Sequence, residues 1–82
     1  MNALLENTDR LHTTEMGVAR IRKNLSLDTE DVVSWCRMKI LDERASVERR
    51  GKNWYVTVSG CIITVNAHSY TIITAHRIRK ET

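Results

Sequence analysis

Histidine, arginine, lysine and tyrosine side chains are the residues of this chain that could act on a phosphate ligand. RNA cleavage without a metal needs a base for the 2′-hydroxyl proton, an acid for the leaving oxygen and cations for the developing charge. We expect His76 and His12 to form this acid–base pair, although His12 could instead hydrogen-bond a loop and a strand histidine is often a surface residue. The side chains expected to bind phosphates or stack on bases are Lys52, Arg49, Arg50, Tyr55, Tyr70, Thr74 and Arg77.

The basic residues are gathered into three short clusters. The chain has 82 residues, 13 Lys and Arg against 10 Asp and Glu, and a formal net charge of +3. The clusters are Arg20, Arg22 and Lys23, then Arg49, Arg50 and Lys52, then Arg77, Arg79 and Lys80. All three lie at the ends of expected elements, so they could converge on one anionic ligand or simply face solvent.

Several other chemistries are disfavoured by the sequence. Cys36 and Cys61 fall on apolar faces and are too few for a disulfide framework, so we expect neither a nucleophile nor a bridge. We expect no metal, because the spacing of His12 and Glu15 needs a continuous helix through two threonines, and we expect no cofactor. Without a long apolar run or a signal peptide, we expect a cytoplasmic protein that does not bind a membrane.

The first half of the chain has helical periodicity. Leu4, Leu5, Leu11, Val18, Ile21 and Leu25 recur at three-, four- and seven-residue steps. A break at residues 12–15 predicts that one short helix ends near Arg10 and that another begins near Thr14, with Thr13 or Thr14 as its N-cap. Residues 28–31 supply a second cap and acidic side chains, which predicts a helix that ends near residue 41 or 42.

From residue 46 the period changes to two, which predicts antiparallel strands. Ser59-Gly60 is a two-residue hairpin turn that would pair Val58 with Cys61, Val56 with Ile63 and Trp54 with Val65 on one apolar face. The last strand depends on the loop at residues 66–69. Three loop residues would put Ile73 and Ala75 in the core and display Tyr70, Ile72, Thr74 and His76 beside Tyr55 and Thr64. Two or four loop residues would exchange the two faces of this strand and display Arg77 and Arg79 on the open face.

These elements predict one α+β domain over residues 1–82. Helices at about 2–42 would pack on one face of a three- to four-stranded antiparallel meander at about 46–79. The other face would carry hydroxyls, aromatics and a titratable or basic group, with enough apolar area to invite a ligand or a second chain.

Five segments of the chain resemble an uncharacterised family of short bacterial proteins, a domain of unknown function. They are HTTEMG (12–17), RIRKNL (20–25), DVVSWC (31–36), GKNWYV (51–56) and ITVNAHSYTIITAH (63–76). The resemblance covers nearly the whole chain and implies no established activity. Residues 70–80, YTIITAHRIRK, together with the helices-then-meander order, also look like small ribonuclease toxins of the RelE and BrnT type. That likeness concerns the fold and implies little about function.

Two hypotheses of different class follow. In the first, the protein binds an RNA or nucleotide-like phosphate ligand, or cleaves RNA as a RelE-like ribonuclease toxin. In the second, it is a non-enzymatic binding module, of the kind found in phages and mobile elements, that sequesters a small ligand or blocks a protein partner as a homo-oligomer. In either case we expect a homodimer, and the open face could also be only its interface.

Overall fold

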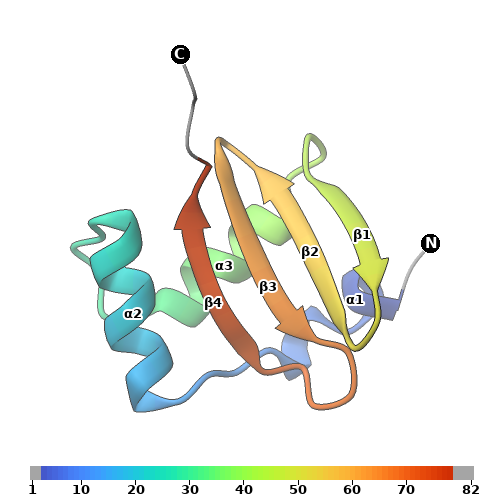
Figure 1. Cartoon of the computed structure of the whole chain (residues 1–82), viewed down its shortest axis with the longest axis horizontal. Helices are drawn as coiled ribbons and strands as arrows, with labels where there is room; N and C mark the ends of the chain where they lie inside the picture. The colour runs from blue at the N-terminus through green and yellow to red at the C-terminus, as the bar shows by residue number, and fades with distance from the viewer. Residues whose placement is uncertain (1–2, 79–82) are drawn as a thin grey trace.

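The computed structural model places helices in the first half of the chain and strands in the second (Figure 1). It describes residues 3–78, so the helix start expected at residue 2 and the basic residues Arg79 and Lys80 lie outside the described residues. The helices are α1 (Ala3–Glu6), the 3-10 helix η1 (Thr8–Arg10), α2 (Glu15–Leu25) and α3 (Val32–Ile40). The strands β1 (Ser46–Arg50), β2 (Asn53–Val58), β3 (Cys61–Asn66) and β4 (Ile72–Arg77) form an antiparallel meander in that order. The expected α+β class is confirmed.

Side-chain caps fix where the two longer helices begin. The Thr14 hydroxyl accepts a hydrogen bond from the Gly17 N–H at 3.0 Å, at the N-terminus of α2. The Asp31 carboxylate accepts one from the Ser34 N–H at 3.0 Å, at the N-terminus of α3. This bond, with a second from the Ser34 hydroxyl, lowers the pKa of Asp31. The predicted breaks before both helices are therefore confirmed.

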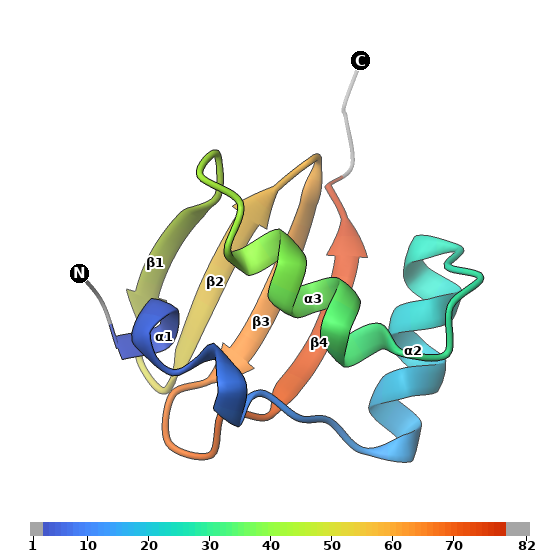
Figure 2. The same ribbon diagram turned by 180° about the vertical axis from the view of Figure 1, so that it is seen from behind.

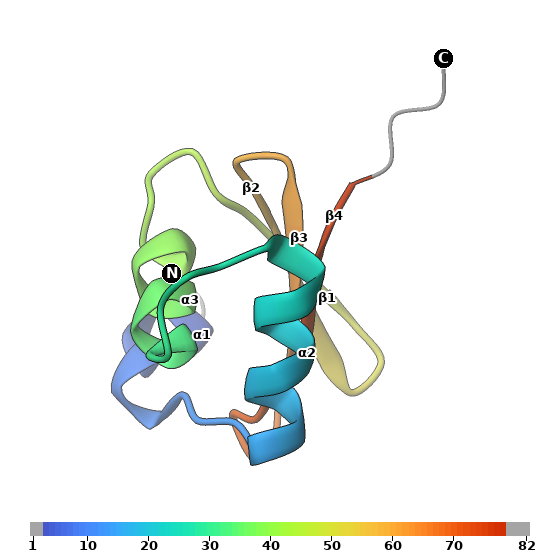
Figure 3. The ribbon, with the colours of Figure 1, turned by 90° about the vertical axis from the view of Figure 1, so that its left-hand side faces the viewer.

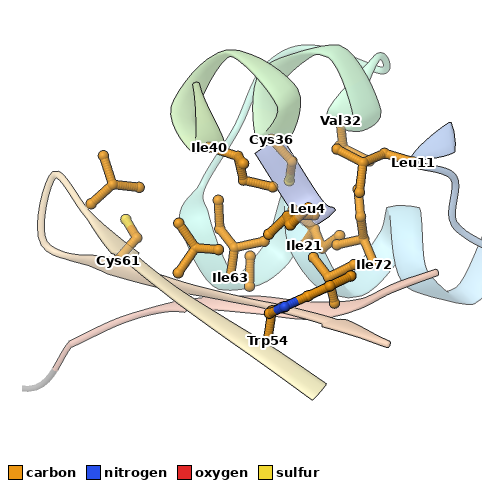
Figure 4. Close-up of a cluster of buried hydrophobic side chains, with 14 of the residues drawn as sticks. Leu4, Leu11, Ile21, Val32, Cys36, Ile40, Trp54, Cys61, Ile63 and Ile72 are labelled. Carbon is orange, nitrogen blue, oxygen red and sulfur yellow. The ribbon is translucent and has the colours of Figure 1, made fainter. Parts of the chain in front are cut away.

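The helices cover one face and one edge of the sheet. α1 and α3 lie behind the sheet in Figure 1 and in front of it in Figure 2. α2 instead runs beside β4, close to the plane of the sheet (Figure 3). Buried side chains from all three helices, among them Leu4, Ile21 and Ile40, meet Ile63 of β3 in one core (Figure 4). The second face of the sheet is left uncovered by the described helices.

The β2–β3 hairpin has the predicted register. Ser59 and Gly60 both have positive φ, 50° and 73°, as a two-residue turn with the twist of the strands requires. The turn therefore sets the pairs Val58–Cys61, Val56–Ile63 and Trp54–Val65, all six of them buried.

A β-bulge in β4 was not predicted. Ile73 is an extra residue between the pairs Thr64–Thr74 and Val65–Ile72. Such an insertion interrupts the alternation of faces along a strand. Ile72 is accordingly 1% exposed and Ile73 38% exposed.

The sequence leaves two registers open for β4, one for a three-residue loop and the reverse for two or four residues. Because of the bulge, each of these registers describes only part of β4. Ala75 is buried, while Thr74 and His76 lie on the open face, as the three-residue loop predicts. Tyr70 and Ile72 are buried, as the opposite register predicts, so placing them on the open face was wrong. The reversed register was wrong about Arg77, which pairs with Cys61 and so lies on the helix side of the sheet.

Candidate nucleic-acid interface

The uncovered side of the sheet, hereafter the open face, is polar and carries one aromatic ring. Its members follow from the strand register and alternate with the residues that face the core. They are Ser46, Glu48 and Arg50 of β1, Asn53, Tyr55 and Thr57 of β2, Ile62, Thr64 and Asn66 of β3, and Thr74 and His76 of β4. Three of the predicted binding residues, Arg50, Tyr55 and Thr74, are among them.

An arginine stacks on the ring at the centre of this face. The Arg50 guanidinium lies over Tyr55, 4.7 Å from the ring centroid, and its Nε is 2.9 Å from a carboxylate oxygen of Glu48. The same row continues on the next two strands through Thr64, which is only 7% exposed, and the half-buried Thr74. Glu48 was not among the predicted site residues. Its alternation with Arg50, two positions later in a strand, would have identified it.

His76 lies at the opposite corner of the open face. It pairs with Ile62, near the end of β4, and its side chain is exposed. It is thus available to a ligand on this face.

His12 is held elsewhere by two hydrogen bonds. Its Nδ1 lies 3.0 Å from the carbonyl of Arg10, and its Nε2 lies 3.0 Å from the hydroxyl of Thr71. Thr71 precedes β4, and five residues of strand separate it from His76, or roughly 16 Å. The structure therefore does not bring the two histidines together as an acid–base pair. The alternative that His12 hydrogen-bonds a loop is what the structure shows.

The β3–β4 loop is organised by side chains. The Asn66 Oδ1 accepts hydrogen bonds from the backbone N–H of His68 and Ser69, at 2.9 and 3.0 Å. The Ser69 hydroxyl lies 2.7 Å from that of Thr71, which also contacts His12. These bonds tie the loop to the segment before α2. His68 is exposed in this loop.

Tyr70 is a packing residue, which corrects its assignment to the ligand surface. It is 5% exposed and has a left-handed backbone, φ 61°. The ring centroid of Tyr70 lies 5.3 Å from the ring centroid of Trp54. The Arg10 guanidinium lies over the Tyr70 ring, 4.3 Å from its centroid. The hydrogen-bonded loop around it supports this unfavourable backbone conformation.

The other predicted binding residues are dispersed. Lys52 is exposed in the β1–β2 turn, beside the Arg50 corner of the sheet. Arg49 points to the helix side, over Trp54, and donates to the carbonyl of Gly51 at 3.0 Å. Arg77 donates to the carbonyl of Leu25 at 3.0 Å and so binds the C-terminal end of α2. Among residues 3–78, Arg49, Lys52 and Arg77 consequently do not meet at a single point.

The two cysteines lie in the core. Burial, with a smaller effect of nearby Cys61, raises the pKa of the Cys36 thiol to about 12. A thiol protonated at neutral pH is a poor nucleophile. Within residues 3–78, no group of three or more His, Cys, Asp or Glu side chains is placed to hold a metal ion. None of the helices in the same range is long and apolar enough to cross a membrane.

Comparison with known proteins gives the family but no activity. No curated protein and no solved structure matches the chain significantly. The model of one family, described as "Protein of unknown function (DUF3781)", matches residues 5–76. Since this match covers most of the chain, the protein belongs to the DUF3781 family.

Proposed function

We propose that the protein binds RNA on the open face of its sheet. The observation that carries this proposal is the Arg50–Tyr55 stack, whose row across β2, β3 and β4 ends at the half-buried Thr74. Aromatic rings and guanidinium planes on an open sheet are the surfaces on which unpaired bases stack, and hydroxyls hydrogen-bond base edges and phosphates.

Binding is better supported than cleavage. His76 is displayed on this face, but His12 is about 16 Å away along β4 and both of its ring nitrogens are engaged. A two-histidine mechanism would need both groups within reach of one phosphate. The fold-level likeness to ribonuclease toxins is compatible with RNA as the ligand and adds no catalytic residue.

The test is fluorescence anisotropy with a labelled single-stranded RNA. Stacking on an aromatic side chain contributes about 1–3 kcal/mol per base, so Tyr55→Ala should weaken binding roughly 5- to 150-fold. Arg50→Gln should weaken it less and reduce its salt dependence. Lys39→Ala is the matched control, since Lys39 lies on α3 on the helix side, over Trp35.

Two results would overturn the proposal. One is an absence of binding to any RNA at low salt by folded protein. The other is binding that Tyr55→Ala and Lys39→Ala weaken equally. A homodimer that buries the open face would produce the first result, and analytical ultracentrifugation would then show the dimer. The same RNA, run on a sequencing gel with wild type and His76→Ala, reports whether cleavage accompanies binding.

A further inference from the structure

α2 carries two cations that extend the open face beyond β4. The Asn24 side chain donates to the carbonyl of Ala75 at 3.2 Å, so this side of the helix faces the β4 edge. An α-helix has 3.6 residues per turn, so the directions of its side chains can be compared by rotation about the helix axis. Ile21 and Leu25 are rotated by about 60° and about 100° from Asn24 in one sense, and both are buried in the core.

The opposite rotation leads to the open side of the sheet. Arg20 and Lys23 lie about 40° and about 100° from Asn24 in that direction. Both side chains are exposed, as expected for residues turned away from the core. Since the core occupies one side of the β4 edge, these cations must project on the other side, next to His76. Arg22 of the same helix points away from β4.

Contacts at both ends of α2 fix this placement. Near its start, the Thr13 hydroxyl donates to the carbonyl of Ile72 at 2.8 Å, and at its end Arg77 donates to the carbonyl of Leu25. Gly17 lets the Thr13 side chain lie close to the first turn of α2, because a Cβ at position 17 would clash with the Thr13 hydroxyl. The cations are therefore held on a docked helix beside the sheet.

Charge is distributed unequally between the two sides of the molecule. Glu48 is the one acidic residue of the four strands, and it is already paired with Arg50. The acidic residues at 28–31 lie in the connection from α2 to α3, which crosses to the helix side (Figure 3). The open side thus has cations at two corners, Arg50 with Lys52 and Arg20 with Lys23.

The two corners are separated by a length that an extended polymer can span. From Arg50 to His76 the path crosses three strand spacings and four residues of strand, which is a diagonal of roughly 20 Å. A stacked strand advances about 3.4 Å per nucleotide, so the path corresponds to about six nucleotides.

We infer that the ligand is a single strand of RNA, at least about six nucleotides long, that crosses the open face diagonally. Its bases would pass Tyr55, and its phosphates would contact Arg50 and Lys52 at one end and Arg20 and Lys23 at the other. This inference rests on the proposed function and adds to it the α2 contact and a minimum length.

The experiment compares labelled oligouridylates of about three and about ten nucleotides, one shorter and one longer than the path. The longer one should bind more tightly. The double variant Arg20→Gln, Lys23→Gln should weaken it about tenfold and reduce its salt slope by about 1.4, at about 0.7 for each lost phosphate contact. The shorter oligonucleotide should be affected less than twofold, because it can remain at the Tyr55 end.

Arg22→Gln is the control for the loss per charge, because it removes one positive charge, against two in the double variant, from a side of the same helix that does not adjoin the open face. The inference is wrong if the short and long oligonucleotides bind equally well, or if Arg22→Gln weakens the longer one as much as the double variant does. In both cases, loss of binding with Tyr55→Ala would leave the proposed function standing. Failure of folded protein to bind either oligonucleotide would overturn both.

Discussion

The two faces of the sheet use neighbouring residues for different purposes. Ile63 is fully buried under the helices, whereas Ile62, one position earlier, is half-buried on the open face beside His76. On the helix side, apolar side chains from helices and strands fill one core. On the open side, a stacked arginine, threonines and a histidine remain accessible. Stability therefore comes mainly from one face, and the side chains of the other are under less demand for packing.

The largest expected effect separates the two faces directly. Ile63→Ala should lower the free energy of unfolding by about 2–5 kcal/mol, since it leaves a cavity in the core. Ile62→Ala should lower it by about 1 kcal/mol or less, because its side chain already contacts water. Urea denaturation of both variants measures the difference. Equal losses would contradict the assignment of stability to the covered face.

The second prediction concerns the edge where α2 meets β4. Gly17→Ala should destabilise the protein by about 1–3 kcal/mol, because the new methyl group overlaps the Thr13 hydroxyl. A substitution without this clash would instead stabilise a helix by about 1 kcal/mol. In a Thr13→Ala background, Gly17→Ala should therefore become neutral or stabilising. A loss of unchanged size in that background would show that the clash is not the cause.

The third prediction tests whether stability and binding are separable. Thr14→Ala removes the N-cap of α2 and should cost about 1 kcal/mol. The helix remains docked through Asn24 and Arg77, so RNA affinity under folding conditions should stay within about twofold. Thermal unfolding and anisotropy on the same sample check both statements. If the fully folded Thr14→Ala variant lost much of its RNA affinity, the cap would also be needed to position Arg20 and Lys23.

The smallest effect is expected from acid. Hydrogen bonds from the Arg44 side chain, and then from its backbone, lower the pKa of Asp42 from 3.8 to about 2. A carboxyl whose pKa is lower in the folded state contributes stability above its unfolded pKa, and this contribution is lost as pH falls through the folded value. The urea midpoint of wild type should hence decline between about pH 4 and pH 2. Asp42→Asn should decline less over that range, and an identical decline would exclude this carboxyl as a contributor.

Local signals predicted much of the fold. Thr14 and Asp31 cap helices because their oxygens accept backbone N–H groups within one turn, and the sequence limits the two caps to residues 13–14 and 28–31. Ser59-Gly60 fixes the hairpin register because a two-residue turn permits one pairing. The site was predicted less well. Arg50, Tyr55 and Thr74 do share the open face, but Tyr70 is packed in the core and His12 is bound to a loop.

The misplaced residues depend on contacts between segments distant in the chain. Tyr70 is buried because Trp54 and Arg10 enclose it, and the strand that follows is bulged at Ile73. No local rule predicts where a bulge is inserted. Arg20, Arg22 and Lys23 form one cluster in the sequence, but the side of α2 that faces β4 is known only from the hydrogen bond between Asn24 and Ala75.

The sequence by itself determined the order of helices and strands, the approximate starts of α2 and α3, the β2–β3 register and the alternation of faces along β2 and β3. These features depend on neighbours within a few residues, where hydrogen bonding and periodicity act directly. The tertiary structure alone decided which histidine is hydrogen-bonded to a distant segment, which tyrosine is buried and which side of α2 faces β4. Each of these outcomes depends on packing between segments 50 or more residues apart, as with Thr71 and His12 or Ala75 and Asn24.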